Sequence, residues 1–233
     1  MESSVFLDFV RLVIDGKLDK ASRRLRASPV LATMSLPVGA TRQQAKEFFF
    51  TAIMHYLYAG DTALHMAAAA FRRPMAELLV GHGADCRARN RRGAEPLHYA
   101  ADANRSEPKA QADVIDYLLS IGAEPDAVDD SGVAPLHRAV RTRSLAAVKA
   151  LLDGGANPRK ANKAGSTPLH LAVQPTGRGG SGSDEARRQQ VGIIRLLLER
   201  GARPTDQDAR GKQVQQAATS EWIRTLLSEA KSG

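Results

Sequence analysis

The stretch Gly165-Ser166-Thr167-Pro168-Leu169-His170 decides the fold of this 233-residue chain, because close variants of it recur at three other places. All four copies keep the leading glycine, the leucine and the final histidine, and three keep the proline. The histidines are separated by 33, 39 and 33 residues. A period of this length is typical of proteins built from stacked repeats. The other copies are Gly60–His65, Gly93–His98 and Gly132–His137.

A second marker, a leucine pair with Gly-Ala a few residues later, recurs in phase with the first. It stands at Leu78-Leu79, Leu118-Leu119, Leu151-Leu152 and Leu197-Leu198, with Gly-Ala at 83, 122, 155 and 201. Two markers that share one period define a repeating unit rather than a chance match.

Each unit is predicted to hold two helices. Thr167 and Pro168 are suited to the start of a helix, because proline at the first helical position needs no N–H group there. A second helix is predicted at Leu145–Asp153, followed by Gly155, where a left-handed conformation costs least for glycine. Residues 157–166 are polar and glycine-containing, which predicts an exposed turn between units.

Together these residues resemble the ankyrin repeat family, whose Thr-Pro-Leu-His-x-Ala signature stands nearly intact at residues 167–172. The resemblance covers about residues 60–233. It implies an all-α, ankyrin-type solenoid of helix-turn-helix units joined by projecting β-turn fingers, with about four clear repeats and a degenerate capping repeat at each end. The expected concave face is formed by the fingers and the first helices of the units.

The predicted organisation has three parts. Residues 1–59 are a degenerate N-terminal helical repeat or cap, residues 60–210 hold the four ankyrin-like repeats, and residues 211–233 are a C-terminal capping repeat. Insertions at 103–112 and 175–190 are expected to enlarge loops between paired helices, since a flexible loop lengthens at little cost. In the N-terminal part, apolar spacing predicts helices up to about Arg26, and residues 41–58 are predicted to be a helix covering the first repeat.

The repeated histidine invites a metal-binding or acid–base interpretation. Neighbouring units of a stack lie about 10 Å apart, too far for ligands that must each approach one ion to roughly 2 Å. In the family that the chain resembles, this histidine instead ties the turn to the helix through backbone hydrogen bonds. Cys86 is the only cysteine, which excludes an intrachain disulfide and a cysteine-based zinc site. No catalytic, metal-binding or cofactor-binding residue is predicted, and no enzyme activity.

Two other features of the sequence give no ligand site. Residues 177–182 formally match the Gly-x-Gly-x-x-Gly nucleotide-binding pattern, but a predicted helix rather than a strand precedes them, so we interpret them as part of a flexible inserted loop. The N-terminal residues resemble neither a signal peptide nor a membrane-spanning segment. A soluble, cytoplasmic protein that does not bind membranes is expected.

The net charge of +8 is distributed in bands along the repeats. Residues 60–92 carry +3, residues 93–131 carry −7 and residues 132–164 carry +6. The first finger is rich in arginine (Arg87–Arg92), the second is acidic (Glu124–Asp130) and the third is basic again (Arg159–Lys163). Because nucleic acid needs a continuous basic track, this alternation favours a protein partner with complementary bands. Banding that arose by accident on a surface selected for solubility is the alternative.

We therefore predict a non-catalytic protein–protein interaction module (a scaffold, an adaptor or an inhibitor) that binds a protein partner on its concave face and finger tips. The predicted contacts are solvated side chains making charge-assisted hydrogen bonds. They are Arg89, Arg91, Arg92, Asp129, Asp130, Arg141, Lys163 and Ser166.

Two alternatives remain open at this point. The chain could bind nucleic acid through its basic fingers, in which case binding weakens steeply with salt. It could also be the interaction part of a larger assembly in which the enlarged loops, especially 103–112, make the contacts.

Overall fold

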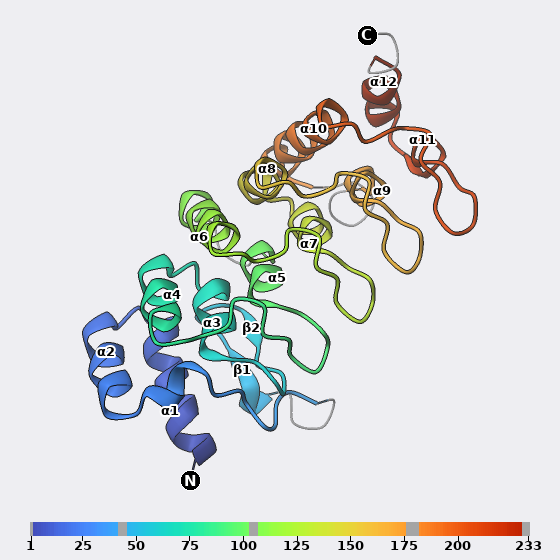
Figure 1. The fold of residues 1–233 in the computed structure, drawn as a ribbon. Coiled ribbons are helices and arrows are strands. Elements are labelled where there is room, and N and C mark those ends of the chain that lie inside the picture. The colour runs from blue at the N-terminus through green and yellow to red at the C-terminus, as the bar shows by residue number, and fades with distance from the viewer. Residues whose placement is uncertain (1, 42–45, 103–106, 176–181, 230–233) are drawn as a thin grey trace.

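The computed structural model describes residues 2–41, 46–102, 107–175 and 182–229. Within them the chain forms twelve α-helices and one short antiparallel sheet, and Figure 1 shows helix pairs stacked from one terminus to the other with long turns projecting to one side. The helices are α1 (Glu2–Ile14), α2 (Leu18–Ala27), α3 (Ala63–Ala69), α4 (Arg73–Val80), α5 (Pro96–Ala101), α6 (Pro108–Ser120), α7 (Pro135–Arg141), α8 (Leu145–Asp153), α9 (Pro168–Ala172), α10 (Asp184–Glu199), α11 (Val214–Ala217) and α12 (Glu221–Glu229). The strands are β1 (Phe49–Phe50) and β2 (His55–Tyr56), which pair through Phe49 with Tyr56 and Phe50 with His55.

The helices form two parallel rows. The first helices α1, α3, α5, α7, α9 and α11 contact one another in that order, and the second helices α2, α4, α6, α8 and α10 form a row behind them (Figure 1). The signature leucines are fully buried between the rows. Burial of each such leucine contributes about 1.5–3 kcal/mol, which explains why the motif recurs in every clear unit. These leucines are Leu64, Leu97, Leu136 and Leu169.

The predicted helix boundaries in the regular units are confirmed. Helix α8 spans Leu145–Asp153, and Gly155 just beyond it has a φ of +91°. Helix α9 begins at Pro168, directly after Thr167 in an extended conformation. Local capping preferences and the apolar period agree here, so both ends of each helix follow from the sequence.

The loop assignment at the two insertions is wrong in part. Residues 108–112 belong to α6 and residues 184–190 belong to α10, so both insertions lengthen the second helix of their unit. The buried amides of Gln111 and Gln190 fix these extra turns, donating to the carbonyl oxygens of Ala100 (2.8 Å) and Ala172 (2.6 Å). The remaining inserted residues 103–106 and 176–181, including most of the glycine-rich nucleotide-like pattern, lie outside the described residues.

The predicted helix at residues 41–58 is also wrong. Residues 46–58 form a short 3₁₀ turn at Lys46–Phe48 and the β1–β2 hairpin, and residues 42–45 lie outside the described part. The expected apolar cover is present nonetheless, because Ile53 is buried and Phe48 and Phe50 pack against the core. The hairpin leads into the turn that precedes α3, and Leu57 directly after it donates to the carbonyl oxygen of Phe48 (2.8 Å).

Helix pairs stand at both ends of the stack. Helices α1 and α2 lie where the spacing of apolar residues predicts them and pack against α3 and α4. At the other end Val214, Ile223 and Leu227 are buried, while Trp222 and Leu226 are half-buried against the same core. None of the helices in the described ranges has the length and apolar character needed to traverse a bilayer.

Candidate functional site

The repeated histidine links each unit to the next one. In the first unit, Nδ1 of His65 accepts a hydrogen bond from the backbone N–H of Thr62 (3.1 Å), so Nε2 carries the proton and donates to the carbonyl oxygen of Ala94 (3.1 Å). The acceptor residue always follows the glycine of the next finger. The equivalent pairs are His98 with Val133, His137 with Ser166, and His170 with Lys212.

The titration of these histidines agrees with a structural role. Burial lowers the pKa of His65, His98 and His137 below the ordinary value of 6.5, and for His98, which also lies near the charge of Arg138, to about 3. A neutral imidazole with both ring nitrogens occupied by backbone groups cannot exchange protons with a substrate. Among the described residues, no group of three or more potential metal ligands is gathered in one place.

Neighbouring fingers are joined by their backbones. One N–H···O=C bond crosses each gap: Arg91 to Ala59 (2.8 Å), Asp130 to Arg92 (2.9 Å), Lys163 to Ser131 (3.3 Å) and Ala209 to Ala164 (3.1 Å). The fit is close, since a Cβ atom on Gly132, whose φ is +72°, would lie 2.7 Å from the backbone nitrogen of Lys163. The fingers therefore present a surface that is already ordered before a partner arrives.

A pocket of about 310 Å³ opens on the face formed by the fingers and first helices. It spans three consecutive units: the segment before α3, the first finger with α5, and the second finger with α7. We call it the finger pocket, and its walls are largely polar. It is lined by His55, Tyr58, Asn90, Arg92, Ala94, Tyr99, Asp102, Asp129, Ser131, Val133, Arg138 and Arg141.

The floor of the finger pocket rests on a buried carboxylate. Asp61 accepts hydrogen bonds from the backbone N–H of Tyr58 (2.6 Å), the amide of Asn90 (2.8 Å) and the hydroxyl of Tyr99 (2.8 Å). Burial, together with the Asp61 charge, raises the pKa of Tyr99 well above 10, so its hydroxyl stays protonated and keeps donating. This network connects the turn before α3 to the first finger and α5, and it fixes the position of both.

Two carboxylates and two guanidinium groups form one wall. Nη2 of Arg138 lies 3.0 Å from Oδ2 of Asp129, and its Nη1 lies 3.6 Å from Oδ2 of Asp102. Arg141, at the end of α7, reaches the same Asp102 at 3.3 Å. Burial acts to raise the pKa of Asp129, but hydrogen bonds from Arg138 and from the backbone of Ser131 and Val133 outweigh it and lower the pKa.

Other lining residues of the finger pocket are aromatic and cationic. The guanidinium carbon of Arg92 lies 4.9 Å from the ring centroid of Tyr58. That of Arg91, which does not line the pocket, lies 5.6 Å from the same centroid. The His55 ring stacks at 4.5 Å against Tyr99. Cation–π contacts of this kind hold an arginine in place while leaving its N–H groups available.

Of the eight predicted contact residues, the structure brings three into the finger pocket: Arg92, Asp129 and Arg141. The expectation that Asp129 is solvated is wrong, because its side chain is only 10% exposed and is paired with Arg138. The other five lie elsewhere on the fingers. Three of them donate to backbone carbonyl groups: Arg89 to Val128, Arg91 to Ala40 and Lys163 to Asp130. Asp130 is exposed, and the carbonyl group of Ser166 accepts a hydrogen bond from His137. Their role in binding stays a prediction.

Sequence reasoning missed most of the pocket. His55 and Tyr58 lie in the segment predicted to be helical, which hid their position. Arg138 directly follows the signature histidine His137 and lies in the wall of the pocket, while Leu136 and Val140 of the same helix are buried in the core. A basic residue at that place beside an acidic finger is the one signal that could have indicated the pairing with Asp129.

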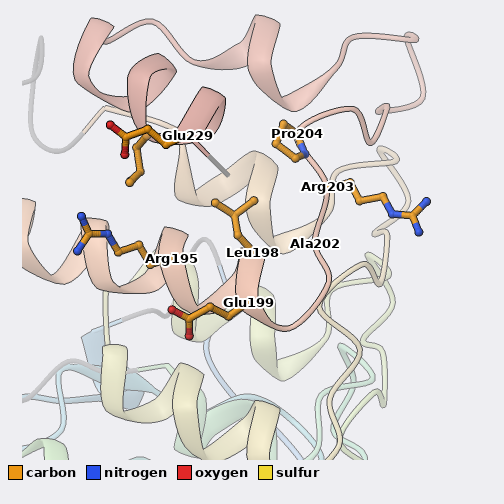
Figure 2. Close-up of a pocket in the computed structure, with 8 residues that line it drawn as sticks. Arg195, Leu198, Glu199, Ala202, Arg203, Pro204 and Glu229 are labelled. Atoms are coloured by element: carbon orange, nitrogen blue, oxygen red, sulfur yellow. The ribbon is translucent and has the colours of Figure 1, made fainter. Parts of the chain in front are cut away.

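A second pocket of about 470 Å³ lies near the C-terminal end, between α10 and α12. Figure 2 shows Leu198 in the middle of this group, Arg195, Glu199 and Glu229 around it, and the Arg203 guanidinium pointing away. The charged groups do not converge on one point, in contrast to those of the finger pocket. This pocket is larger, but its charged groups lack the convergent arrangement that is typical of a ligand site.

Comparison with known proteins gives a consistent picture. A family model described as ankyrin repeats (3 copies) matches residues 107–208, and one described as ankyrin repeats (many copies) matches residues 64–107. Protein phosphatase 1 regulatory subunit 27 is similar over 131 residues, or 56% of this chain, with 30% identity for the mouse protein and 36% for the human one. The match covers 66% of each subunit, just under two thirds. The E3 ubiquitin-protein ligase KEG of Arabidopsis thaliana is 40% identical over 81 residues, which are 35% of this chain and 5% of the ligase. Two family models of ankyrin repeats match the chain, and the histidine links between units and the two rows of helices agree with them. The chain therefore belongs to the ankyrin repeat family.

Proposed function

We propose that this chain is a non-catalytic protein-binding module that holds a segment of another protein in the finger pocket and along the adjoining fingers. The observation that carries the proposal is the finger pocket itself, a polar hollow that three consecutive units build together. Its floor and one wall are fixed by buried hydrogen bonds and ion pairs, so little ordering cost remains when a partner binds.

The shape and size of the pocket support a protein partner. A volume of about 310 Å³ is at the lower end for small-molecule sites and suits one or two side chains of an extended segment. The row of fingers continues on both sides of it and offers further contact area. Catalysis is not favoured, because the charged groups in the wall are paired with one another and, among the described residues, no histidine accepts from the hydroxyl of Ser131.

The comparisons support the same class of function. Two relatives are named as regulatory subunits of a protein phosphatase, which is a role exercised through association with another protein. Under this proposal the chain acts as a scaffold, adaptor or inhibitor toward its partner. The names of the relatives make the catalytic subunit of protein phosphatase 1 the first purified partner to test.

The experiment is an affinity capture with the full chain and two matched variants. Ser131→Trp fills the finger pocket at an exposed position whose side chain makes no hydrogen bond in the described structure. Ser120→Trp places the same side chain at the end of α6, in the row of second helices. A discrete protein should be retained by the wild type and by Ser120→Trp and lost with Ser131→Trp.

Two results would contradict the proposal. Retention of the same protein by all three forms would move binding away from the pocket, for example to the insertion around residues 107–112. Nucleic acid in the eluate, released by moderate salt, would identify a basic-finger site for nucleic acid instead. Purified protein phosphatase 1 tested in parallel would show whether the partner of the relatives is shared.

A further inference from the structure

The unused hydrogen-bonding capacity of the finger pocket includes the N–H donors of two arginines. An arginine offers five N–H donors in a planar fork. The side chain of Arg92 contacts the face of Tyr58 at 4.9 Å and, among the described residues, meets no hydrogen-bond acceptor. The aromatic ring therefore holds the guanidinium group of Arg92 in place, while its N–H donors stay available to a ligand.

Arg141 is the second such group. Its side chain is 60% exposed, and it reaches the two oxygens of Asp102 only through Nη2, at 3.3 Å to each. These bonds are long for a pair of opposite charges, which normally approach to 2.7–2.9 Å. Most of the donor capacity of Arg141, a residue that lines the pocket, is thus without a partner among the described residues and accessible to solvent.

The carboxylates of the pocket are already engaged. Oδ1 of Asp129 accepts from the backbone N–H groups of Ser131 and Val133, and Oδ2 accepts from Arg138. The Asp102 side chain, 15% exposed, lies behind Arg138 and Arg141. The carboxylates therefore present little surface to an incoming group, and the accessible charge is positive.

We infer that the finger pocket binds an anionic side chain of the partner, held between the guanidinium groups of Arg92 and Arg141. This inference rests on the proposed function and names the chemistry that the pocket selects. A carboxylate or a phosphate monoester would satisfy the planar donor forks of both arginines, since each group accepts hydrogen bonds in pairs. Lysine or arginine side chains of a partner would meet two cations and find the carboxylates occupied.

The test uses random peptides displayed on phage and selected on the full chain, with Ser131→Trp as the counter-selection. Peptides that pass should share an aspartate or glutamate. Replacing that residue by its amide should weaken binding about tenfold to a hundredfold, the effect of one to two charge-assisted bonds. A synthetic peptide with phosphoserine at the same place distinguishes a preference for phosphate from one for carboxylate.

The protein side of the test uses Arg92→Gln and Arg141→Gln. Each should weaken the acidic peptide about tenfold and leave the amide peptide unchanged, which shows that the arginine and the acid interact directly. Arg188→Gln, an exposed arginine on α10 paired with Glu185, is the matched control and should bind both peptides like the wild type. Thermal melting of all three variants shows whether the fold is intact.

The outcomes separate this inference from the proposed function. Peptides that require an open pocket but share no acidic residue, or that bind Arg92→Gln and Arg141→Gln normally, overturn the anionic preference and leave the protein-binding role standing. Failure to obtain any peptide that discriminates the wild type from Ser131→Trp overturns both.

Discussion

Nη2 of Arg138 and Oδ2 of Asp129 are 3.0 Å apart, and each side chain is about nine-tenths buried in the wall of the finger pocket. The pair connects α7 to the finger that precedes it. Charges so far from water stabilise a fold only while both partners are present, because removal of one leaves the other unpaired.

Replacement of Arg138 should therefore destabilise the chain strongly. Arg138→Met leaves Asp129 and Asp102 without their shared cation, and we expect the free energy of unfolding to fall by about 3 kcal/mol. Arg141→Met removes a 60% exposed partner of the same Asp102 and should cost less than about 1 kcal/mol. Urea titrations of both variants measure the difference. Equal stability of the two would show that the buried pair contributes nothing.

The stability of the chain should depend on pH through its buried histidines. The pKa of His98 is about 3 in the folded chain against 6.5 for a free imidazole, so the unfolded chain binds more protons between these values. The contribution is complete above pH 6.5 and is lost as the pH falls toward 3, at up to about 1.4 kcal/mol per pH unit. His98→Asn should flatten the decline of unfolding free energy between about pH 6 and pH 4. An unchanged slope would assign the acid sensitivity to other groups.

Two glycines with the same backbone conformation should respond differently to alanine. Gly122 and Gly132 have φ values of +97° and +72°, so alanine is strained at both, by about 1–2 kcal/mol. Only at Gly132 would the new Cβ atom meet the neighbouring finger, 2.7 Å from the Lys163 nitrogen, whereas Gly122 has open space. Gly132→Ala should cost at least about 1 kcal/mol more than Gly122→Ala in thermal or urea unfolding. Equal losses would mean that the fingers separate freely.

The buried carboxylate of Asp61 should make Tyr99→Phe costly. The variant removes a hydroxyl that lies 2.8 Å from Asp61 and leaves the other donors in place, and we expect a loss of about 1–3 kcal/mol. The double variant with Asp61→Asn should lose less than the sum of the two single changes, because each single change already removes the bond between the Tyr99 hydroxyl and the Asp61 carboxylate. Strict additivity would show that the two groups do not interact.

The regular part of the fold could be predicted because its determinants are local. Thr167 and Pro168 start α9, Gly155 follows the end of α8, and apolar residues inside α8, such as Val148 and Leu151, recur with helical spacing. The hairpin at Phe49–Tyr56 could not be predicted, since a short apolar run such as Phe48–Phe50 fits a helix and a strand equally well. Its structure depends on contacts with residues later in the sequence, such as that of His55 with Tyr99.

The lengthened helices illustrate another limit. Residues 184–190 follow a glycine- and serine-rich stretch, which favoured a loop, yet they add turns to α10 because Gln190 can bond back to Ala172. The finger pocket could not be predicted either, because it too depends on contacts made only in the folded chain. The fold of the second finger brings Asp129 next to Arg138, whereas the sequence shows that both charges are present but not that they pair.

The walls of the finger pocket belong to three different units, so the width of the pocket depends on the angles between those units. Arg92 and Arg141 stand on neighbouring units, so the gap between them depends on how sharply the stack bends. A contact that changes the angle between these neighbouring units alters that gap and therefore the affinity for a bound segment. Binding in the pocket is therefore sensitive to the curvature of the solenoid at these three units.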